Sequence, residues 1–230
     1  MTIIDELDLA KVLQGVAIAQ LGHGVVAAAL DPRAPQAGLM PCEEATVDRA
    51  LPARRREYAC GRAAARGAMA GIGVFGQPVT TAEDGSPSWP CGVVGSITHS
   101  DRVCLAAVGR AESIESIGLA LSDAEPLEEA RLHTVLTPHE RDWLEEAPVI
   151  RRGVLAKLIL SAKECAYKCQ YPLTGLSFGF DELEIALDTD NRTFRAIPLD
   201  APIPPEIAAR MCGRYVSVMG QMLTTMVLRR

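Results

Sequence analysis

A cluster of arginines is the first feature of this sequence that could do chemistry. Six fall within eighteen residues, namely Arg49, Arg54, Arg55, Arg56, Arg62 and Arg66. Arg62 and Arg66 are one helical turn apart, so their guanidinium groups could bind a phosphate through paired hydrogen bonds. The net charge is −6, and a local basic cluster in an acidic chain favours an anionic ligand over a polyanion track. An amphipathic helix with a basic face would give the same pattern.

A second polar feature is the run Gly95-Ser-Ile-Thr-His99, which precedes an apolar stretch. A glycine followed by hydroxyl groups and a histidine can present several hydrogen-bond donors to a phosphate. His99 would add an N–H group or a positive charge. A polar turn with an incidental histidine is the alternative explanation.

A third group of charges lies in the run Leu160-Ser-Ala-Lys-Glu-Cys-Ala-Tyr-Lys168. If the run is helical, Glu164 and Lys168 are neighbours on one helix face, and Lys163 lies beside them in sequence. Such pairs are common on solvated helix surfaces, so this run alone says nothing about function.

Two predicted helices position these charges. Residues 53–71 are rich in alanine and arginine, and Tyr58, Ala65 and Met69 recur at helical spacing. Residues 151–170 form the longest candidate helix, and Pro172 is expected to stop it. The runs 103–108 and 117–121 are short and apolar, which is typical of buried strands.

The remaining pattern predicts more strands than helices. Residues 16–19 and 24–30 resemble two strands joined by a turn, and 126–147 resembles two helices, the second capped at Thr137. A loop is expected over 76–95. Further strands are expected over 176–187, 193–198, 212–220 and 222–229. This order is not a regular βαβ alternation, so an α+β fold is favoured.

Length and composition exclude several classes of protein. A chain of 230 residues suits one large or two small domains. The pI of about 5.3 argues against a nucleic-acid binder. No apolar run reaches ~18 residues, so no membrane span is expected. Seven cysteines without zinc spacing, and an acidic start in place of a signal peptide, favour reduced thiols in the cytoplasm.

The order and spacing of these runs are more specific than any run alone. The arginine-rich helix is followed by Trp89-Pro-Cys-Gly-Val-Val-Gly-Ser-Ile-Thr-His99, then by Ser116-Ile-Gly118, Glu125-Pro-Leu127 and the run 160–168. This layout resembles the 4′-phosphopantetheinyl transferases of the surfactin and enterobactin type. The resemblance implies two similar α+β halves in a pseudo-twofold arrangement, here residues 1–115 and 116–230, with a ligand cleft between them in a monomer.

The resemblance also implies the activity. These transferases move the phosphopantetheine arm of coenzyme A to a serine of an acyl, peptidyl or aryl carrier protein, in secondary metabolism among other pathways, and release adenosine 3′,5′-bisphosphate. Attack on a diphosphate builds charge on its oxygens, so catalysis depends on positioning and charge neutralisation. By similarity, the residues that would bind coenzyme A are Arg55, Arg62, Arg66, Gly85, Trp89, Pro90, Thr98 and His99.

The catalytic residues follow from the same resemblance. Glu164 would bind Mg²⁺, Lys168 would neutralise the diphosphate, and Lys163 would assist. The family's two other acidic metal ligands, however, fall on Ala120 and Ser122. Asp123 points to the opposite face if the strand is regular, although a bulge at Ser122 could turn it inward.

The loss of two carboxylates leaves three functions open. The chain could be a transferase with weak or absent Mg²⁺ binding. It could be a pseudoenzyme that binds coenzyme A or a carrier protein without transfer. It could also be an enzyme of different chemistry on the same scaffold. Ala120 and Ser122 favour the second and third functions, whereas the retained Lys163, Glu164, Lys168 and His99 favour the first or some continued use of the cleft.

Overall fold

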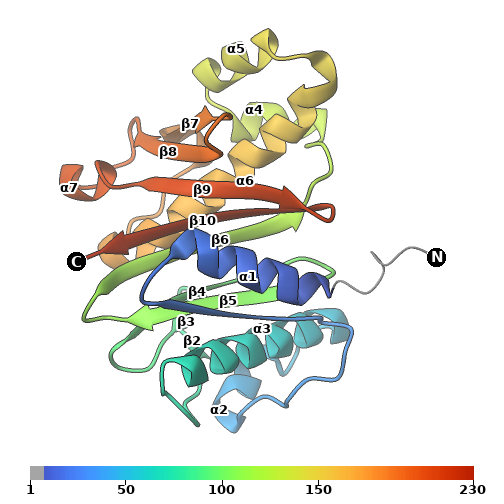
Figure 1. Ribbon diagram of the computed structural model, residues 1–230, viewed down its shortest axis with the longest axis vertical. Coiled ribbons are helices and arrows are strands. Elements are labelled where there is room, and N and C mark those ends of the chain that lie inside the picture. The colour runs from blue at the N-terminus through green and yellow to red at the C-terminus, as the bar shows by residue number, and fades with distance from the viewer. Residues whose placement is uncertain (1–7) are drawn as a thin grey trace. The chain divides into compact units, whose positions relative to one another are not determined.

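The computed structural model describes residues 8–230 and divides into two compact units. The first unit comprises the described residues up to Ile117 together with Arg229 and Arg230, and the second comprises Gly118–Leu228. Both contain helices and antiparallel strands (Figure 1). The predicted α+β class is confirmed. No helix in the described part of the chain is long and apolar enough to cross a membrane.

The first unit is built on a three-stranded antiparallel sheet in the order β1-β5-β4. A short hairpin of β2 and β3 accompanies it. The elements are α1 (Leu9–Leu21), β1 (Val25–Leu30), α2 (Pro41–Glu44), the 3₁₀ turn η2 (Ala45–Val47), α3 (Pro52–Gly71), β2 (Thr80–Thr81), β3 (Pro87–Ser88), β4 (Val93–His99) and β5 (Cys104–Arg110).

Helix α3 confirms the helix predicted over 53–71. It starts with Pro52 in its first turn, where a missing N–H group does no harm. Its buried side chains include Ala65, Ala68 and Met69, which pack on the sheet with Ala106 and Val108 among others. The arginines lie toward the other faces of the helix, except for Arg62, which is buried.

The strand predicted over 16–19 is wrong, because these residues belong to helix α1. Leu13, Ala17 and Leu21 are buried at a spacing of four residues, which is a helical stripe. The side chain of Asp8 caps the start of the helix by accepting a hydrogen bond from the Ala10 N–H at 3.0 Å. Gly22 ends it with φ of +73°. The strand predicted over 24–30 is present as β1.

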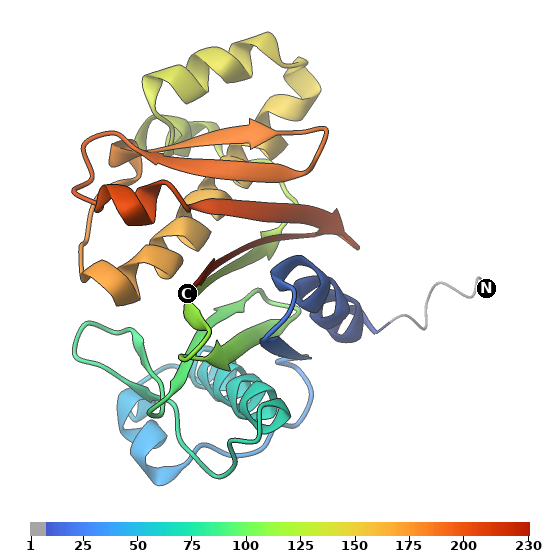
Figure 2. The same ribbon diagram turned by 60° about the vertical axis from the view of Figure 1, so that its left-hand side comes forward.

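The second unit contains a five-stranded sheet in the order β6-β10-β9-β8-β7. Helix α6 contacts this sheet and runs along one face of it (Figure 2). The elements are β6 (Ile114–Asp123), η3 (Glu129–Arg131), α4 (Leu132–Val135), α5 (Pro138–Glu146), α6 (Val149–Thr174), η4 (Phe180–Glu182), β7 (Leu183–Asp188), β8 (Thr193–Pro198), α7 (Pro205–Ala208), β9 (Cys212–Val218) and β10 (Gln221–Arg229).

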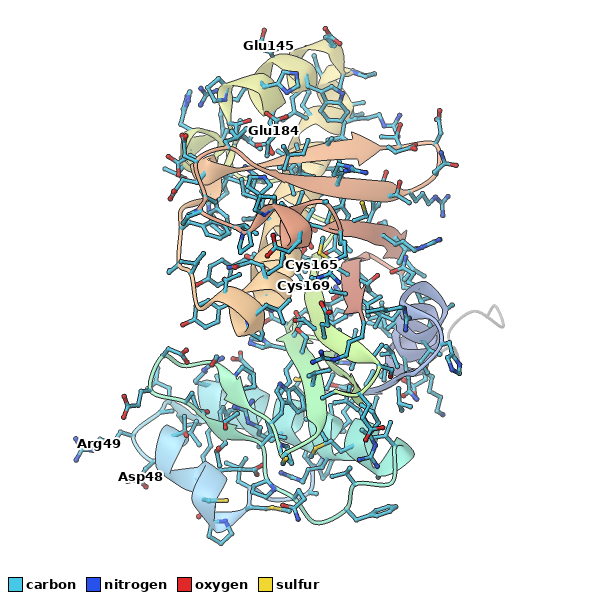
Figure 3. All side chains as sticks on the ribbon, turned by 90° about the vertical axis from the view of Figure 1, so that its left-hand side faces the viewer. Asp48, Arg49, Glu145, Cys165, Cys169 and Glu184 are labelled. Atoms are coloured by element: carbon cyan, nitrogen blue, oxygen red, sulfur yellow. The ribbon has the colours of Figure 1, made fainter. Side chains whose placement is uncertain are left out.

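Helix α6 lies very close to strand β6. A Cβ atom added to Gly118 would lie 2.1 Å from the carbonyl oxygen of Cys165 and 2.8 Å from Cβ of Cys169. These two cysteines are one turn apart on α6 (Figure 3). Gly118 therefore faces α6, and Ala120 and Ser122 share that face because side chains alternate along a strand.

The end of α6 differs from the prediction. Pro172 does not stop the helix but lies inside its last turn, and the helix runs to Thr174. A proline this close to the end removes only one backbone hydrogen bond. Gly175 then adopts the left-handed conformation with φ of +67°, and its N–H group donates to the carbonyl of Tyr171 at 2.8 Å.

The segment after α6 also differs from the prediction. A strand was expected over 176–187, but only β7 from Leu183 to Asp188 is extended and paired, in register with β8. Residues 176–182 are irregular apart from one 3₁₀ turn. Four residues of this irregular segment line a cavity together with Glu164 and Lys168.

Candidate functional site

The first unit brings Arg54 and His99 together. Arg54 lies in the first turns of α3, and His99 is the last residue of β4. Their side chains approach to 3.4 Å between Nη1 and Nε2. Arg54 also lies 3.5 Å from the carboxylate of Glu57. Both Arg54 and His99 are exposed, so this corner of the unit offers nitrogen donors to an anion in solution.

The Arg62 side chain is buried. Its guanidinium group lies 4.2 Å from the centre of the Tyr58 ring, a cation–π contact. One Nη donates to the hydroxyl of Thr81 at 2.9 Å, and that hydroxyl also bonds the Tyr58 hydroxyl at 2.8 Å. Its Nε is buried and has no hydrogen-bond partner among the described residues. Arg62 thus keeps one donor unused, although it is only 6% exposed.

Arg66 is bound by a buried acid. It forms an ion pair with Glu43 at 2.6 Å, and it also donates to the carbonyl of Gly38 at 2.9 Å. The carboxylate of Glu43 is fully buried and accepts from the N–H groups of Met40 and Val79 as well. Arg66 therefore closes the 38–43 loop onto α3, and we do not include it among the residues proposed to contact a ligand.

Arg55 lies at the edge of a separate surface cavity of about 520 Å³. The walls are the 32–38 loop and one face of α3, with Arg33, Arg55 and Arg56 as the charged members. Arg55 also pairs with Glu44 at 3.0 Å. The structure thus places Arg54, rather than Arg55, beside His99.

The loop residues expected near a nucleotide have different environments. Gly85 is exposed in a turn with φ of +84°, next to the Asp84 side chain that accepts from the Ser86 N–H. Trp89 packs on the sheet core, where a Cβ on Gly95 would lie 2.7 Å from the Trp89 ring. Pro90 is half-buried and Thr98 is buried.

The second unit places Glu164 and Lys168 at one cavity. This cavity has a volume of about 290 Å³ and is lined by Glu164, Tyr167, Lys168 and the segment Ser177, Phe178, Gly179 and Phe180. Three aromatic side chains thus surround a carboxylate and an ammonium group. The sequence predicted the two charged residues, but it gave no signal for the aromatic wall.

Lys168 is a desolvated cation. Its ammonium group donates to the carbonyl of Leu119 on β6 at 3.1 Å. Burial lowers the pKa of Lys168, and the negative charge of Glu164 partly opposes that shift. An ammonium group that has already lost part of its hydration shell interacts strongly with an incoming phosphate.

Lys163 has a different position from the one expected of a catalytic residue. It is fully buried, and its ammonium group contacts three oxygens at 2.7 Å each, on the Glu140 carboxylate and the Val135 and Phe180 carbonyls. Burial lowers the pKa of Lys163, and the hydrogen bond and charge of the Glu140 carboxylate partly oppose that shift. Three donors meet three acceptors, so Lys163 is not among the residues proposed to contact a ligand.

The positions expected for two metal ligands carry no carboxylate in the structure. Ala120 is 1% exposed and belongs to the apolar core beneath α6. The Ser122 hydroxyl is buried and has no hydrogen-bond partner within residues 8–230. Asp123 is turned to solvent and pairs with Lys157 at 3.2 Å, and β6 runs through Asp123.

These residues do not fit a resident Mg²⁺ site. Magnesium requires several hard oxygen ligands in octahedral array, whereas Glu164 is the one carboxylate that the described residues bring to this face of α6 and β6. Within residues 8–230, no three histidine, cysteine, aspartate or glutamate side chains gather to hold a metal ion.

The ion-pair partners of two buried acids could not be predicted from the sequence. Glu43 pairs with Arg66, which the resemblance had assigned to coenzyme A binding, and Glu140 pairs with Lys163, which it had assigned to catalysis. The capping motif at Thr137 did predict Glu140 at the start of α5, where its carboxylate accepts from the Thr137 N–H at 2.8 Å. Nothing local predicted its contact with Lys163, 23 residues further along the chain.

Comparisons with known proteins identify relatives over most of this chain. The model of the 4′-phosphopantetheinyl transferase N-terminal domain matches residues 42–109, and that of the 4′-phosphopantetheinyl transferase superfamily matches residues 114–211. The 4′-phosphopantetheinyl transferase Svp of Streptomyces mobaraensis is 43% identical over 166 residues, which cover 72% of this chain and 68% of the relative.

Two further relatives extend the similarity. The 4′-phosphopantetheinyl transferase Npt of Nocardia iowensis is 38% identical over 66% of this chain and 67% of its own length. The 4′-phosphopantetheinyl transferase PptT of Mycobacterium tuberculosis is 33% identical over 82% of this chain and 86% of its own length. With both family models matched in sequence order, this chain belongs to the 4′-phosphopantetheinyl transferase superfamily.

Proposed function

We propose that this protein binds coenzyme A and transfers its phosphopantetheine arm to a serine of a carrier protein, at a rate reduced by the loss of two metal ligands. Family membership supports the reaction class. The observation that carries the proposal is that Glu164 and a desolvated Lys168 line the same aromatic-walled cavity. Arg54 and His99 offer further donors for phosphate.

The proposed reaction makes one P–O bond and breaks another. The carrier serine oxygen attacks the phosphorus that bears the pantetheine arm, its proton is released, and adenosine 3′,5′-bisphosphate leaves with the bridging oxygen. Negative charge increases on the diphosphate oxygens during this step. In this chain Lys168 is the group that we assign to that charge, because its ammonium is already desolvated and fixed on the Leu119 carbonyl.

The reduced rate follows from positions 120 and 122. Where Mg²⁺ assists phosphoryl transfer, it needs oxygen ligands from the protein, and here alanine and an unpartnered serine hydroxyl take two of the expected places. Coenzyme A binding is expected to survive this loss, because Lys168, Arg54, Arg62 and His99 remain. Any Mg²⁺ contribution to the reaction is therefore expected to be weak.

A pseudoenzyme that binds coenzyme A or a carrier protein is the second candidate. The burial of Ala120 in an apolar core favours it, because the alanine side chain offers no oxygen where a metal ligand is expected. An enzyme of different chemistry on the same scaffold remains the third. In each case we expect a cytoplasmic monomer, a setting that suits seven free cysteines.

Two measurements separate these functions. Calorimetry with coenzyme A tests binding, and Lys168→Ala is expected to weaken it while Lys157→Ala, elsewhere on the same helix, leaves it unchanged. Mass spectrometry of a panel of apo carrier proteins, incubated with the protein, coenzyme A and Mg²⁺, tests transfer. Slow gain of one phosphopantetheine mass on a carrier supports the transferase. Binding without any gain supports the pseudoenzyme, and absence of binding overturns the proposal.

A further inference from the structure

The irregular segment 176–180 forms one wall of the cavity that holds Glu164 and Lys168. Four of the seven residues around that cavity are Ser177, Phe178, Gly179 and Phe180. The segment has no strand partner, because β7 begins only at Leu183. Its position must therefore be fixed by side chains rather than by a ladder of backbone hydrogen bonds.

Three side chains of α6 hold this segment. Gln170 Nε2 donates to the carbonyl of Leu176 at 2.9 Å, the Tyr167 hydroxyl donates to the Ser177 hydroxyl at 3.3 Å, and Lys163 Nζ donates to the carbonyl of Phe180 at 2.7 Å. The Tyr167 ring also meets the Phe178 ring edge-on, with centroids 5.5 Å apart.

The order of these contacts is regular. Residues 163, 167 and 170 are four and three apart, so they lie on one face of the helix. Their partners follow in the opposite direction, since Gln170 meets Leu176 and Lys163 meets Phe180. The segment therefore runs back antiparallel along α6, past the two charged residues of the cavity.

The two ends of this arrangement are fully buried. Lys163 and Gln170 are both 0% exposed. The charge of Lys163 is balanced by Glu140, which in turn accepts from the Ile185 N–H on β7 at 2.7 Å. Gln170 also accepts from the Thr174 hydroxyl, and that hydroxyl accepts from the Leu176 N–H at 3.1 Å.

Such burial of polar groups adds little stability compared with apolar packing. It does define one geometry, because a displaced segment would leave a buried amide and a buried ammonium group without partners. The polar contacts therefore favour one position of segment 176–180 on α6 over others.

We propose that Lys163, Tyr167 and Gln170 form a clasp that fixes segment 176–180 on α6 and so sets the width of the cavity beside Glu164 and Lys168 for a long, thiol-ended ligand chain. They are positioning residues, because they act through the segment. The identity of the ligand rests on the proposed function, whereas the holding of the segment does not.

The test compares two clasp variants with a control on the same helix. Tyr167→Phe removes one hydroxyl and keeps the ring contacts, and Gln170→Met keeps the side-chain length but removes the donor to Leu176. Lys157→Met breaks the partly exposed pair with Asp123 and serves as control. Hydrogen exchange of a peptide covering 176–182 is expected to be about tenfold faster in Gln170→Met, and less so in Tyr167→Phe. The control and peptides of the first unit should exchange as in the wild type.

Calorimetry with two probes supplies the ligand readout. Coenzyme A and adenosine 3′,5′-bisphosphate share the nucleotide, but only the former carries the thiol-ended chain. Gln170→Met is expected to weaken the binding of coenzyme A about tenfold and to leave the affinity for the bisphosphate unchanged. The proposal is overturned if Gln170→Met loses the same affinity for both probes, or if it loses affinity for neither.

The two proposals fail in different ways. If the wild type binds neither probe, the proposed function fails, and the exchange measurement alone decides whether the clasp exists. Faster exchange confined to 176–182 supports the clasp in that case. Unchanged exchange in both variants overturns it whatever the ligand result.

Discussion

Ala120 and Ser122 share the face of β6 that packs against α6, and Ala120 is 1% exposed there. Replacing them with Ala120→Asp and Ser122→Glu would place two carboxylates on that face, toward the helix that carries Glu164. Without a cation, three acids crowded there should lower stability by about 3 kcal/mol, since burying unpaired charge is unfavourable. Added Mg²⁺ should restore about 2.7 kcal/mol at a hundredfold excess over its Kd.

Thermal unfolding with and without Mg²⁺ checks this prediction. The expected result is a melting temperature that rises with Mg²⁺ in the double variant and does not move in the wild type. If the melting temperature of the double variant does not change with Mg²⁺, positions 120 and 122 do not face Glu164. Any gain in transfer rate should appear only together with the gain in melting temperature.

Lys168 provides a prediction about pH. Burial lowers its pKa, so its ammonium loses the proton at a lower pH than an ordinary lysine does. Below that lowered pKa it is charged and attracts the diphosphate, and as the pH rises through it the attraction disappears. Coenzyme A affinity should therefore fall on the alkaline side below pH ~10.4, the usual lysine value.

Lys168→Arg is the matched variant for this experiment, because guanidinium stays charged at any such pH. Calorimetry across the alkaline range is expected to show a decline in the wild type and a flat profile in Lys168→Arg. A decline of the same shape in both proteins would assign the titration to another group.

At the scale of elements, the contact between β6 and α6 is set by Gly118. A Cβ at this position would lie 2.1 Å from a backbone oxygen, which a side-chain rotation cannot relieve. Gly118→Ala should therefore move the helix off the strand and destabilise the protein by about 3 kcal/mol, near the upper end for overpacked sites. The same shift would displace Lys168 from the Leu119 carbonyl.

Gly15→Ala is the control for Gly118→Ala. Gly15 is exposed within α1, and an added Cβ would meet nothing within 4 Å. Because alanine favours a helix over glycine, this change should stabilise by about 0.5–1 kcal/mol. Urea denaturation should thus shift the two midpoints in opposite directions, and equal shifts would refute the packing argument.

The elements also show what the sequence could and could not predict. Helices α3 and α6 are long and periodic, and both were predicted. Helix α1 was missed because its run Val16-Ala-Ile-Ala is short and apolar, whereas its buried stripe is the sparser set Leu13, Ala17 and Leu21. The 176–182 segment was mistaken for a strand because its contacts are made by side chains of α6.

The candidate site, like the elements, could be predicted from the sequence only in part. Glu164, Lys168 and His99 remain predicted site residues, and they could be proposed from the sequence because their motifs are local. Arg66 and Lys163 form ion pairs with the buried acids Glu43 and Glu140. Each acid lies 23 residues before its partner in the sequence. Only tertiary structure reveals such pairing, because neither helix periodicity nor spacing specifies which acid a buried base will meet.

At the scale of the whole chain, Arg229 and Arg230 belong to the first unit, although Arg229 is the last residue of β10. Arg229 donates to the carbonyl of His23 at 2.6 Å and to that of Leu21, at the end of α1. A cation at a helix C-terminus also interacts favourably with the helix dipole. Arg229 therefore stabilises the C-terminal end of helix α1.

Arg229→Ala should accordingly destabilise the first unit by about 1 kcal/mol, since it removes charged donors from two carbonyls at a partly exposed site. Hydrogen exchange should become faster over residues 18–24, where α1 ends, and stay unchanged over β7 and β8. Arg230→Ala is the comparison, because Arg230 donates to the Ala111 carbonyl and not to α1. Equal exchange over 18–24 in the two variants would mean that α1 holds its C-terminus through Gly22 alone.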